Sequence, residues 1–205
     1  MENRYNESLN LRCRYCMNKL VALFIIFSPL CAADWRLNSD SSHLSFVSIK
    51  NGVFAEVHRF KSLTGGVNEE GDAAVRIGLA SVETNIPIRN ERLKSMLFEI
   101  ATFSLATVNS KLNMSDFISL PPGASLLALV PLNINLHGID GKIPASVKVT
   151  RSSESVWHVV SIQPLILDAS NYKLAAGIES LRAIAGLNDI TTVIPVTFSL
   201  EFTRS

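Results

Sequence analysis

The sequence predicts an all-β fold of antiparallel strands, on three observations. From Trp35 onward, apolar side chains recur at every second residue, which is the period of a strand with one buried face. Turn-forming residues such as Lys50-Asn51-Gly52 and Pro121-Pro122-Gly123 separate these alternations at the spacing of a meander. No segment between them is long enough for a crossover helix, so a doubly wound α/β fold is disfavoured.

The predicted strands follow one another along the chain. Four alternating stretches are the clearest, namely Leu44–Ser48, Phe54–Phe60, Val75–Leu79 and Leu132–Leu136. We assign four of their apolar side chains to the inward face, namely Phe46, Ile77, Ile134 and Leu136. Because neighbouring side chains on a strand point to opposite faces, Asn135 is expected to face outward. A glutamate at position 134 should therefore do more damage than one at position 135.

The run Thr192–Phe202 predicts the last strand. Its apolar face carries Ile194, Val196, Phe198, Leu200 and Phe202. Pro195 cannot donate a ladder hydrogen bond, so we expect it near a sheet edge, at a bulge or at the strand entrance.

Two segments have the spacing of short amphipathic helices. In Arg89–Ile100 the apolar residues fall at i, i+3, i+4 and i+7, and in Gly177–Gly186 they also lie on one side. The apolar stripes are expected to cover part of a barrel or sandwich. Arg89, Arg92 and Glu99 are expected to point to solvent.

Composition places the chain among ordinary globular proteins. Of its 205 residues 47% are apolar, with only 10 Gly and 8 Pro, which disfavours disordered and low-complexity classes. The 19 Lys and Arg nearly balance the 18 Asp and Glu, giving a formal net charge of +1. Such a chain has no broad basic field, so nucleic acid is not an expected partner.

The start of the chain resembles a secretory leader. Lys19 precedes the apolar run Leu20–Leu30, and the small residues Cys31-Ala32-Ala33 follow it. At about 11 residues the run is short for a bilayer span, which needs about 20, so no stable membrane span is expected. An N-terminal anchor and a lipoprotein attached through Cys31 are the less favoured alternatives.

The leader divides the chain into three parts. Residues 17–33 form the predicted signal peptide, with cleavage after Ala33 and export to the periplasm. Residues 1–16 are polar and of mixed charge, so we interpret them as a spurious upstream extension of a chain that starts at Met17. Residues 34–205 are treated as one domain.

The mature chain offers little catalytic chemistry. All three cysteines lie in residues 1–33, so disulfides, thiolate metal sites and a cysteine nucleophile are excluded from residues 34–205. Glu56-x-His58 could supply two metal ligands, but an exposed polar face or one buried hydrogen bond is the favoured interpretation. The sequence lacks a G-x-S-x-G elbow and a phosphate loop, although it leaves a Ser-His-Asp arrangement open. No metal site, cofactor or catalytic residue is expected.

Several motifs from Trp35 to the end of the chain occur in the order of one protein family. The most specific block begins with Ser81-Val82-Glu83-Thr84, continues through Ile88–Ser95 and ends at Phe98. The other matching segments are Trp35–Leu37, Ser42–Phe46, Phe60–Val67, and Leu132–Ile139 ahead of Lys142 and Val147. In these motifs the chain resembles the YceI-like proteins, which are lipid- or polyisoprenoid-binding domains of the bacterial periplasm. Asn90 stands where that family usually has Asp.

The resemblance implies an extended, lipocalin-like antiparallel β-barrel of about eight strands, a size whose interior can hold one small ligand. One or two short helices would cover it, and an amphiphilic isoprenoid would occupy its lumen. The candidate ligand-binding residues are Leu44, Phe46, Phe54, Phe60, Ile77, Leu79, Leu93, Leu97, Phe103, Leu132, Ile134 and Leu136. Arg89 and Arg92 are head-group candidates, although stabilising the short helix is their favoured role. Glu83 and Thr84 are expected to act in the turn and helix cap before them.

The implied function is binding or carriage of an isoprenoid, a quinone or another amphiphilic lipid. Two alternatives stay open. One is a scaffold or regulatory partner of a membrane-associated protein, with a vestigial cavity, and the other is an enzyme that acts on a lipid. The sequence leaves both a monomer and a homodimer open.

Overall fold

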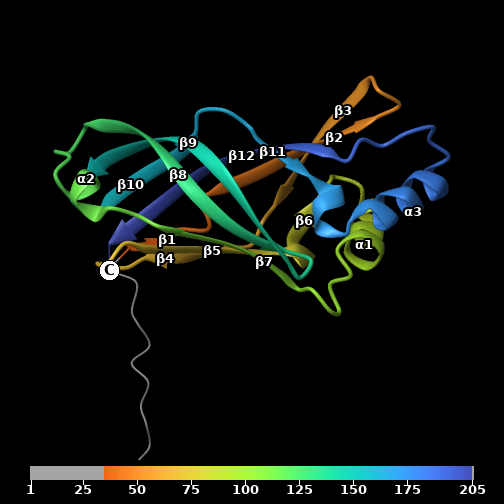
Figure 1. The fold of residues 1–205 in the computed structure, drawn as a ribbon, viewed down its shortest axis with the longest axis horizontal. Helices are drawn as coiled ribbons and strands as arrows, with labels where there is room; N and C mark the ends of the chain where they lie inside the picture. Colours follow the sequence, from red (N-terminus) through yellow and green to blue (C-terminus); the bar gives the residue numbers. More distant parts are fainter. Residues whose placement is uncertain (1–34, 205) are drawn as a thin grey trace, which may run out of the picture. The chain divides into compact units, whose positions relative to one another are not determined.

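The computed structural model describes residues 35–204, so the leader and translation-start predictions lie outside the described residues. Residues 35–204 form twelve strands (Figure 1). They are β1 (Trp35–Leu37), β2 (His43–Lys50), β3 (Phe54–Phe60), β4 (Leu63–Val67), β5 (Asp72–Gly78), β6 (Val82–Glu83), β7 (Leu105–Lys111), β8 (Ser125–Leu136), β9 (Ile139–Ser153), β10 (Val156–Ser161), β11 (Leu165–Asp168) and β12 (Val193–Arg204).

Eight of these strands close into an antiparallel barrel in the order β1-β4-β5-β7-β8-β9-β10-β12, because β1 also pairs with β12. The predicted all-β, lipocalin-like fold is therefore confirmed. Strands β1 and β12 make the closing contact, in which Trp35 lies opposite both Val67 of β4 and Arg204 of β12. A closed sheet has no free edge there, which removes a site of aggregation.

The long strand β12 links two parts of the wall. Near its end, Phe202 lies between Leu37 of β1 and Trp157 of β10. Near its start, Val196 lies between Phe46 of β2 and Leu165 of β11. From this second part β2, β3 and β6 extend the sheet. Pro195 is the third residue of β12, so of the three places predicted for it, a sheet edge, a bulge or the strand entrance, the structure shows the strand entrance.

The helices are short. They are α1 (Pro87–Arg92), followed directly by a π-helical turn (Leu93–Leu97), α2 (Met114–Ile118) and α3 (Ala175–Ala185), with single 3-10 turns at Leu79–Ser81 and Ala169–Tyr172. Pro87 suits the first turn of α1, where a missing N–H leaves no bond unmade. Both predicted helical segments are confirmed, whereas α2 lies in a segment for which the sequence predicted no helix. No helix within residues 35–204 has the length and apolarity of a membrane span.

The helices mark two ends of the barrel. In Figure 1, α1, α3 and the hairpin of β2 and β3 gather at the right-hand end of the view, and α2 lies at the left-hand end. The π-helical turn and α3 approach closely, since a Cβ on Gly177 would lie 2.6 Å from the carbonyl oxygen of Met96. Only glycine allows this approach, which fixes α3 beside the turn.

Inward side chains of the strands form the core. The predicted inward residues Ile77, Ile134 and Leu136 are 6%, 8% and 9% exposed, and Phe46 packs against them partly buried. The period-two prediction of side-chain direction is therefore confirmed for these strands. Asn135 does lie on the other face, where its amide donates to Asp140 at 2.7 Å.

Candidate functional site

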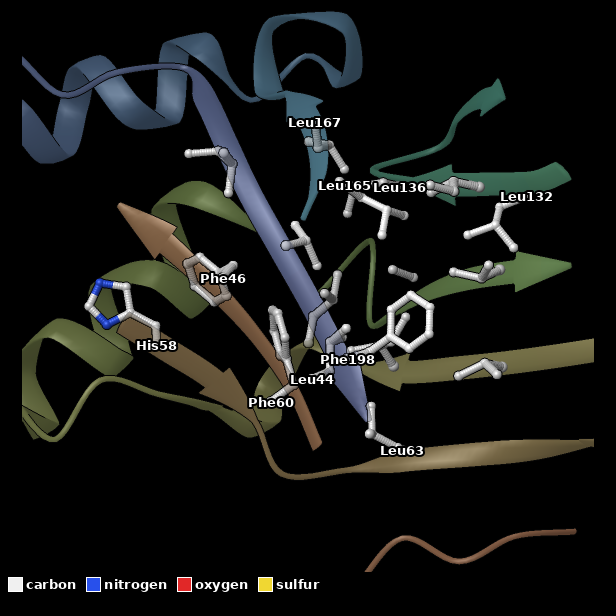
Figure 2. Close-up of a pocket in the computed structure, with 18 of the residues that line it drawn as sticks. Leu44, Phe46, His58, Phe60, Leu63, Leu132, Leu136, Leu165, Leu167 and Phe198 are labelled. Carbon is white, nitrogen blue, oxygen red and sulfur yellow. The ribbon is translucent and has the colours of Figure 1, made fainter. Parts of the chain in front are cut away.

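The barrel encloses a cavity of about 510 Å³. A volume of this size lies in the range of small-molecule sites. Aliphatic and aromatic side chains of β2, β3, β8 and β12, among other strands, converge on it (Figure 2). The interior is therefore suited to an apolar ligand, since apolar enclosure gains free energy in proportion to the area removed from water.

Aromatic side chains close one end of the cavity. The indole rings of Trp35 and Trp157 meet edge to face, with centroids 5.4 Å apart, and Phe117 of α2 lies 6.4 Å from Trp157. All three are buried and line the cavity. Outside them, the guanidinium groups of Arg151 and Arg204 lie 5.6 Å and 5.7 Å from the ring centroids of Trp157 and Trp35. Cation–π attraction of this kind helps to hold the two rings in place.

The opposite end of the cavity opens to solvent. Ile86, next to α1, and Ile88, within it, line the cavity although 44% and 59% of their surface is exposed. Ala185 at the end of α3 also lines the cavity and is exposed. Side chains that face both the lumen and the solvent mark an opening. We call this end, with α1, α3 and the hairpin of β2 and β3, the mouth.

Charged side chains gather at the mouth around the carboxylate of Glu56. Lys50 donates to it, and Arg89 Nη1 donates to it at 2.6 Å. Arg89 Nη2 also donates to the carbonyl oxygen of Thr84 at 2.7 Å. The hydrogen bond from Lys50, followed by the charge of Arg89, holds the pKa of Glu56 below its usual value. Lys50, Arg89 and Arg92 all line the cavity, so cations outnumber carboxylates there.

The arginines differ from the sequence prediction in their direction. Arg89 and Arg92 were expected to point to solvent, but both are only partly exposed and face the cavity. Arg89 is drawn inward by Glu56 of β3, a partner that helical periodicity alone does not reveal. Glu99 is 56% exposed, as expected.

His58 is a buried neutral histidine beside this cluster. Its side chain is 4% exposed, and Nε2 lies 2.9 Å from Ser48 Oγ. Burial, and secondly the charge of Arg89, lower its pKa from 6.5 to about 4. Its Nδ1 has no hydrogen-bond partner among residues 35–204. Of the interpretations of Glu56-x-His58, the single buried hydrogen bond is the one present, and no cluster of three metal-ligating side chains occurs within the described residues.

The pKa of His58 predicts a pH-dependent stability. Because the folded-state pKa lies below the unfolded value of 6.5, the unfolded chain binds the proton more readily between pH 6.5 and about 4. The free energy of unfolding should therefore fall by up to about 3 kcal/mol as the pH drops through this window, at 1.36 kcal/mol per pKa unit. Denaturant titrations at pH 7 and 4.5 measure it. His58→Leu should reduce the difference in unfolding free energy between the two pH values, whereas His158→Gln, at a more exposed histidine, should leave that difference unchanged. An unchanged difference in His58→Leu would contradict the assignment of this pH dependence to His58.

The turn between β6 and α1 is held by side chains. The backbone N–H and the hydroxyl of Thr84 donate to Asn90 Oδ1, at 2.9 Å and 2.6 Å, and Asn90 Nδ2 donates to Glu83 Oε1 at 2.9 Å. An aspartate at position 90 could not make the last bond while ionised. Glu83 and Thr84 are thus turn residues, as predicted. Their predicted capping role is wrong, because α1 follows Ile86 without a side-chain cap.

Most predicted ligand-binding residues face the cavity. Those lining it are Leu44, Phe46, Phe60, Ile77, Leu79, Leu93, Leu97, Leu132, Ile134 and Leu136, together with Arg89 and Arg92. Two are placed elsewhere. Phe54 is 63% exposed, because β3 runs beyond the barrel wall at that point. Phe103 packs on His137, with ring centroids 4.2 Å apart, and covers the turn between β8 and β9 instead.

Several residues that line the cavity were not among those predicted from the sequence. Ser48 is the last residue of the predicted alternating stretch Leu44–Ser48, and Lys50 lies two residues beyond it on the same face of β2, so this alternation was the signal for both. Trp35 and Trp157 at the closed end carry no such pattern, since their meeting depends on the closure of the barrel.

The family model of the YceI-like domain matches residues 35–202. The chain belongs to the YceI-like family. This YceI-like chain is similar to a solved polyisoprenoid-binding domain from Saccharophagus degradans implicated in plant cell wall breakdown. The two are 38% identical with a TM-score of 0.83, over 85% of this chain and 100% of that one.

A second solved structure shares the fold. BcnA of Burkholderia cenocepacia has a TM-score of 0.59 at 17% identity, over 80% of this YceI-like chain and 98% of its own. At that identity the likeness extends to the fold alone. A comparison with curated proteins finds no match.

Proposed function

We propose that this YceI-like chain is a periplasmic binding or carrier protein that holds an amphiphilic isoprenoid lipid, of polyprenyl or quinone type, in its barrel. The observation that carries the proposal is the cavity, which is lined mainly by apolar side chains along the barrel, is closed by tryptophans and has its charged lining residues at the mouth. The relative from Saccharophagus degradans, described as polyisoprenoid-binding, supports the same ligand class.

The two unlike ends of the cavity orient the ligand. The tail lies along the barrel toward Trp35 and Trp157, and the head group lies at the mouth near Lys50, Arg89 and Arg92. Each buried methylene contributes about 0.8 kcal/mol, so the tail supplies most of the binding free energy. Part of that gain is lost in ordering the tail.

The polar groups at the mouth favour binding over catalysis. Lys50 and Arg89 both bond Glu56, which occupies its carboxylate. Ser48 and His58 form a hydroxyl–imidazole pair, but the pKa of His58 is lowered to about 4 and its Nδ1 has no hydrogen-bond partner among residues 35–204, so His58 is a weak base that no third group orients. Mass spectrometry of an organic extract of the purified protein tests the proposal. An isoprenoid at near one molecule per chain supports it. If the purified protein contains no lipid, however it is prepared, and binds no added isoprenoid, the scaffold alternative is favoured. Turnover of an added lipid favours the enzyme alternative.

Export belongs to the same proposal. The leader at residues 17–33 would deliver a mature chain that starts at Asp34, from translation at Met17. N-terminal sequencing of the exported protein checks both points, and retention of Leu20–Leu30 in a membrane fraction contradicts the cleaved form.

Arg92 is expected to set head-group preference. It lines the cavity, and the described residues provide it with no ion pair, whereas Arg89 is committed to Glu56 and Thr84. Arg92→Gln should weaken binding of a prenyl phosphate about tenfold, as expected for loss of a charge-assisted hydrogen bond. Binding of the matching prenyl alcohol should change little. Calorimetric titration of both lipids measures this.

The control for Arg92→Gln removes the same charge from the barrel wall. Arg76→Gln serves, because Arg76 is exposed on β5 and does not line the cavity. Equal losses in the two variants would show that only net charge matters.

A further inference from the structure

Exposed apolar side chains surround the mouth. Ile86 and Ile88 are exposed at the start of α1 while facing the lumen. Val53 and Phe54, at the tip of the hairpin of β2 and β3, are 75% and 63% exposed. A group of large exposed apolar residues around an opening is unusual for a surface that contacts only water, and such groups mark interaction sites.

The hairpin tip is fixed to the mouth. Asn51 N–H donates to the carbonyl oxygen of Asp189, and the N–H of Asn188 donates to Asn51 Oδ1, both at 2.9 Å. Residues 188–190 follow α3, and Ile190 pairs with Lys50. The apolar tip and the two isoleucines therefore belong to one end of the barrel.

The face of Phe54 is set by the alternation of β3. Phe54 is two residues from Glu56 and four from His58, so all three side chains leave the strand on the same face. His58 lines the cavity and Glu56 bonds the lining residues Lys50 and Arg89, which places Phe54 on the mouth side of the hairpin. It thus continues the lining beyond the wall.

Cations accompany this apolar rim. Lys50, Arg89 and Arg92 line the mouth, and the first two bond Glu56. The carboxylates of α1 and α3, Glu91 and Glu179, are paired with Lys94 and Arg182. An apolar rim with excess positive charge fits the surface of a bilayer that contains anionic phospholipid, where apolar side chains enter the acyl boundary and cations meet phosphates.

We propose that the mouth is a docking surface for an anionic bilayer, with Phe54, Ile86 and Ile88 entering the interface and the cavity opening against it. Docking in this position lets an insoluble tail pass between membrane and barrel without crossing water. That use rests on the proposed lipid-carrier function, whereas docking itself needs no bound lipid.

The barrel wall supplies a matched control. Leu127 and Leu129 of β8 are 68% and 70% exposed, comparable with the mouth residues, and they are absent from the cavity lining. Their cross-strand partners on β9 are Lys148 and Ser146. They test whether any exposed apolar pair is enough for membrane binding.

The experiment is co-sedimentation of the mature chain with vesicles of phosphatidylethanolamine containing a minority of phosphatidylglycerol. The Phe54→Ser/Ile88→Ser double variant should lose at least about tenfold in vesicle partition, and Leu127→Ser/Leu129→Ser should stay within about twofold of the parent. Phosphatidylcholine vesicles alone should bind the parent more weakly. Thermal unfolding of both double variants, expected near that of the parent, excludes misfolding.

Three outcomes overturn the proposal. The first is that the parent binds neither kind of vesicle, as expected if the mouth meets a protein instead. The second is an equal loss of vesicle binding in the two double variants. The third is binding that does not depend on the phosphatidylglycerol content of the vesicles. Lipid extraction from the same samples separates the two proposals. If the chain binds vesicles but never contains an isoprenoid, the docking proposal holds and the carrier proposal is contradicted. If the chain contains an isoprenoid but does not bind vesicles, the carrier proposal holds and the docking proposal is contradicted.

Discussion

Ile134→Glu is expected to leave little folded protein. Ile134 is 8% exposed, lies between Val108 of β7 and Gly141 of β9, and faces the cavity. A carboxylate there has no partner among the apolar lining residues, and burying it costs several kcal/mol even after relaxation, on the order of what unfolding a domain takes in total. Soluble yield and denaturant unfolding of any recovered protein measure the loss.

The control for this variant should be Asn133→Glu. Asn135, expected from sequence to tolerate glutamate, donates to Asp140, so a glutamate there would face a second carboxylate. Asn133 is exposed and lies opposite Lys142 of β9, which suits a negative charge. Asn133→Glu should therefore keep near-parental stability. Comparable damage from both variants would mean that the inward register of β8 is wrong.

Affinity should rise steeply with the length of an isoprenoid tail until the cavity is full. Each added isoprene unit buries several carbon groups at up to about 0.8 kcal/mol each, and about 1.4 kcal/mol corresponds to tenfold in affinity. Because ordering the tail offsets much of this gain, we expect roughly tenfold tighter binding per unit in a series of prenyl alcohols, followed by a plateau. Calorimetric titration measures the series, and a chelator should have no effect.

The two tryptophans provide an internal measure of reach in the same series. Trp35 and Trp157 both lie at the closed end, far from the mouth along the barrel. Short-tailed alcohols should therefore bind without changing tryptophan fluorescence, and the change should begin only at the length that reaches the indoles. A fluorescence change independent of tail length, or binding abolished by a chelator, contradicts the carrier mechanism.

Local pattern was enough to predict much of the wall. Alternation along β2, β5 and β8 gave the direction of Phe46, Ile77 and Ile134, because a strand with one buried face must place every second side chain inward. The mouth helices were also predictable, since α3 buries Ile178 on the apolar side of its 3.6-residue period.

Alternation alone could not show where the wall ends. Phe54 and Phe60 share one face of β3, yet only Phe60 lines the lumen, since the strand continues past the barrel. The inward turn of Arg89 depends on Glu56, 33 residues earlier in the chain. The low pKa of His58 likewise depends on burial and on that arginine.

The sequence by itself determined an antiparallel β-domain of the YceI-like family, with an apolar inward face and short covering helices, because these follow from local periodicity and from motifs. Only the tertiary structure decided that the cavity has a closed aromatic end and a charged, apolar-rimmed mouth. Those two ends arise where β1 meets β12 and where β3 meets α1, and contacts between segments so distant in sequence leave no periodic trace in it.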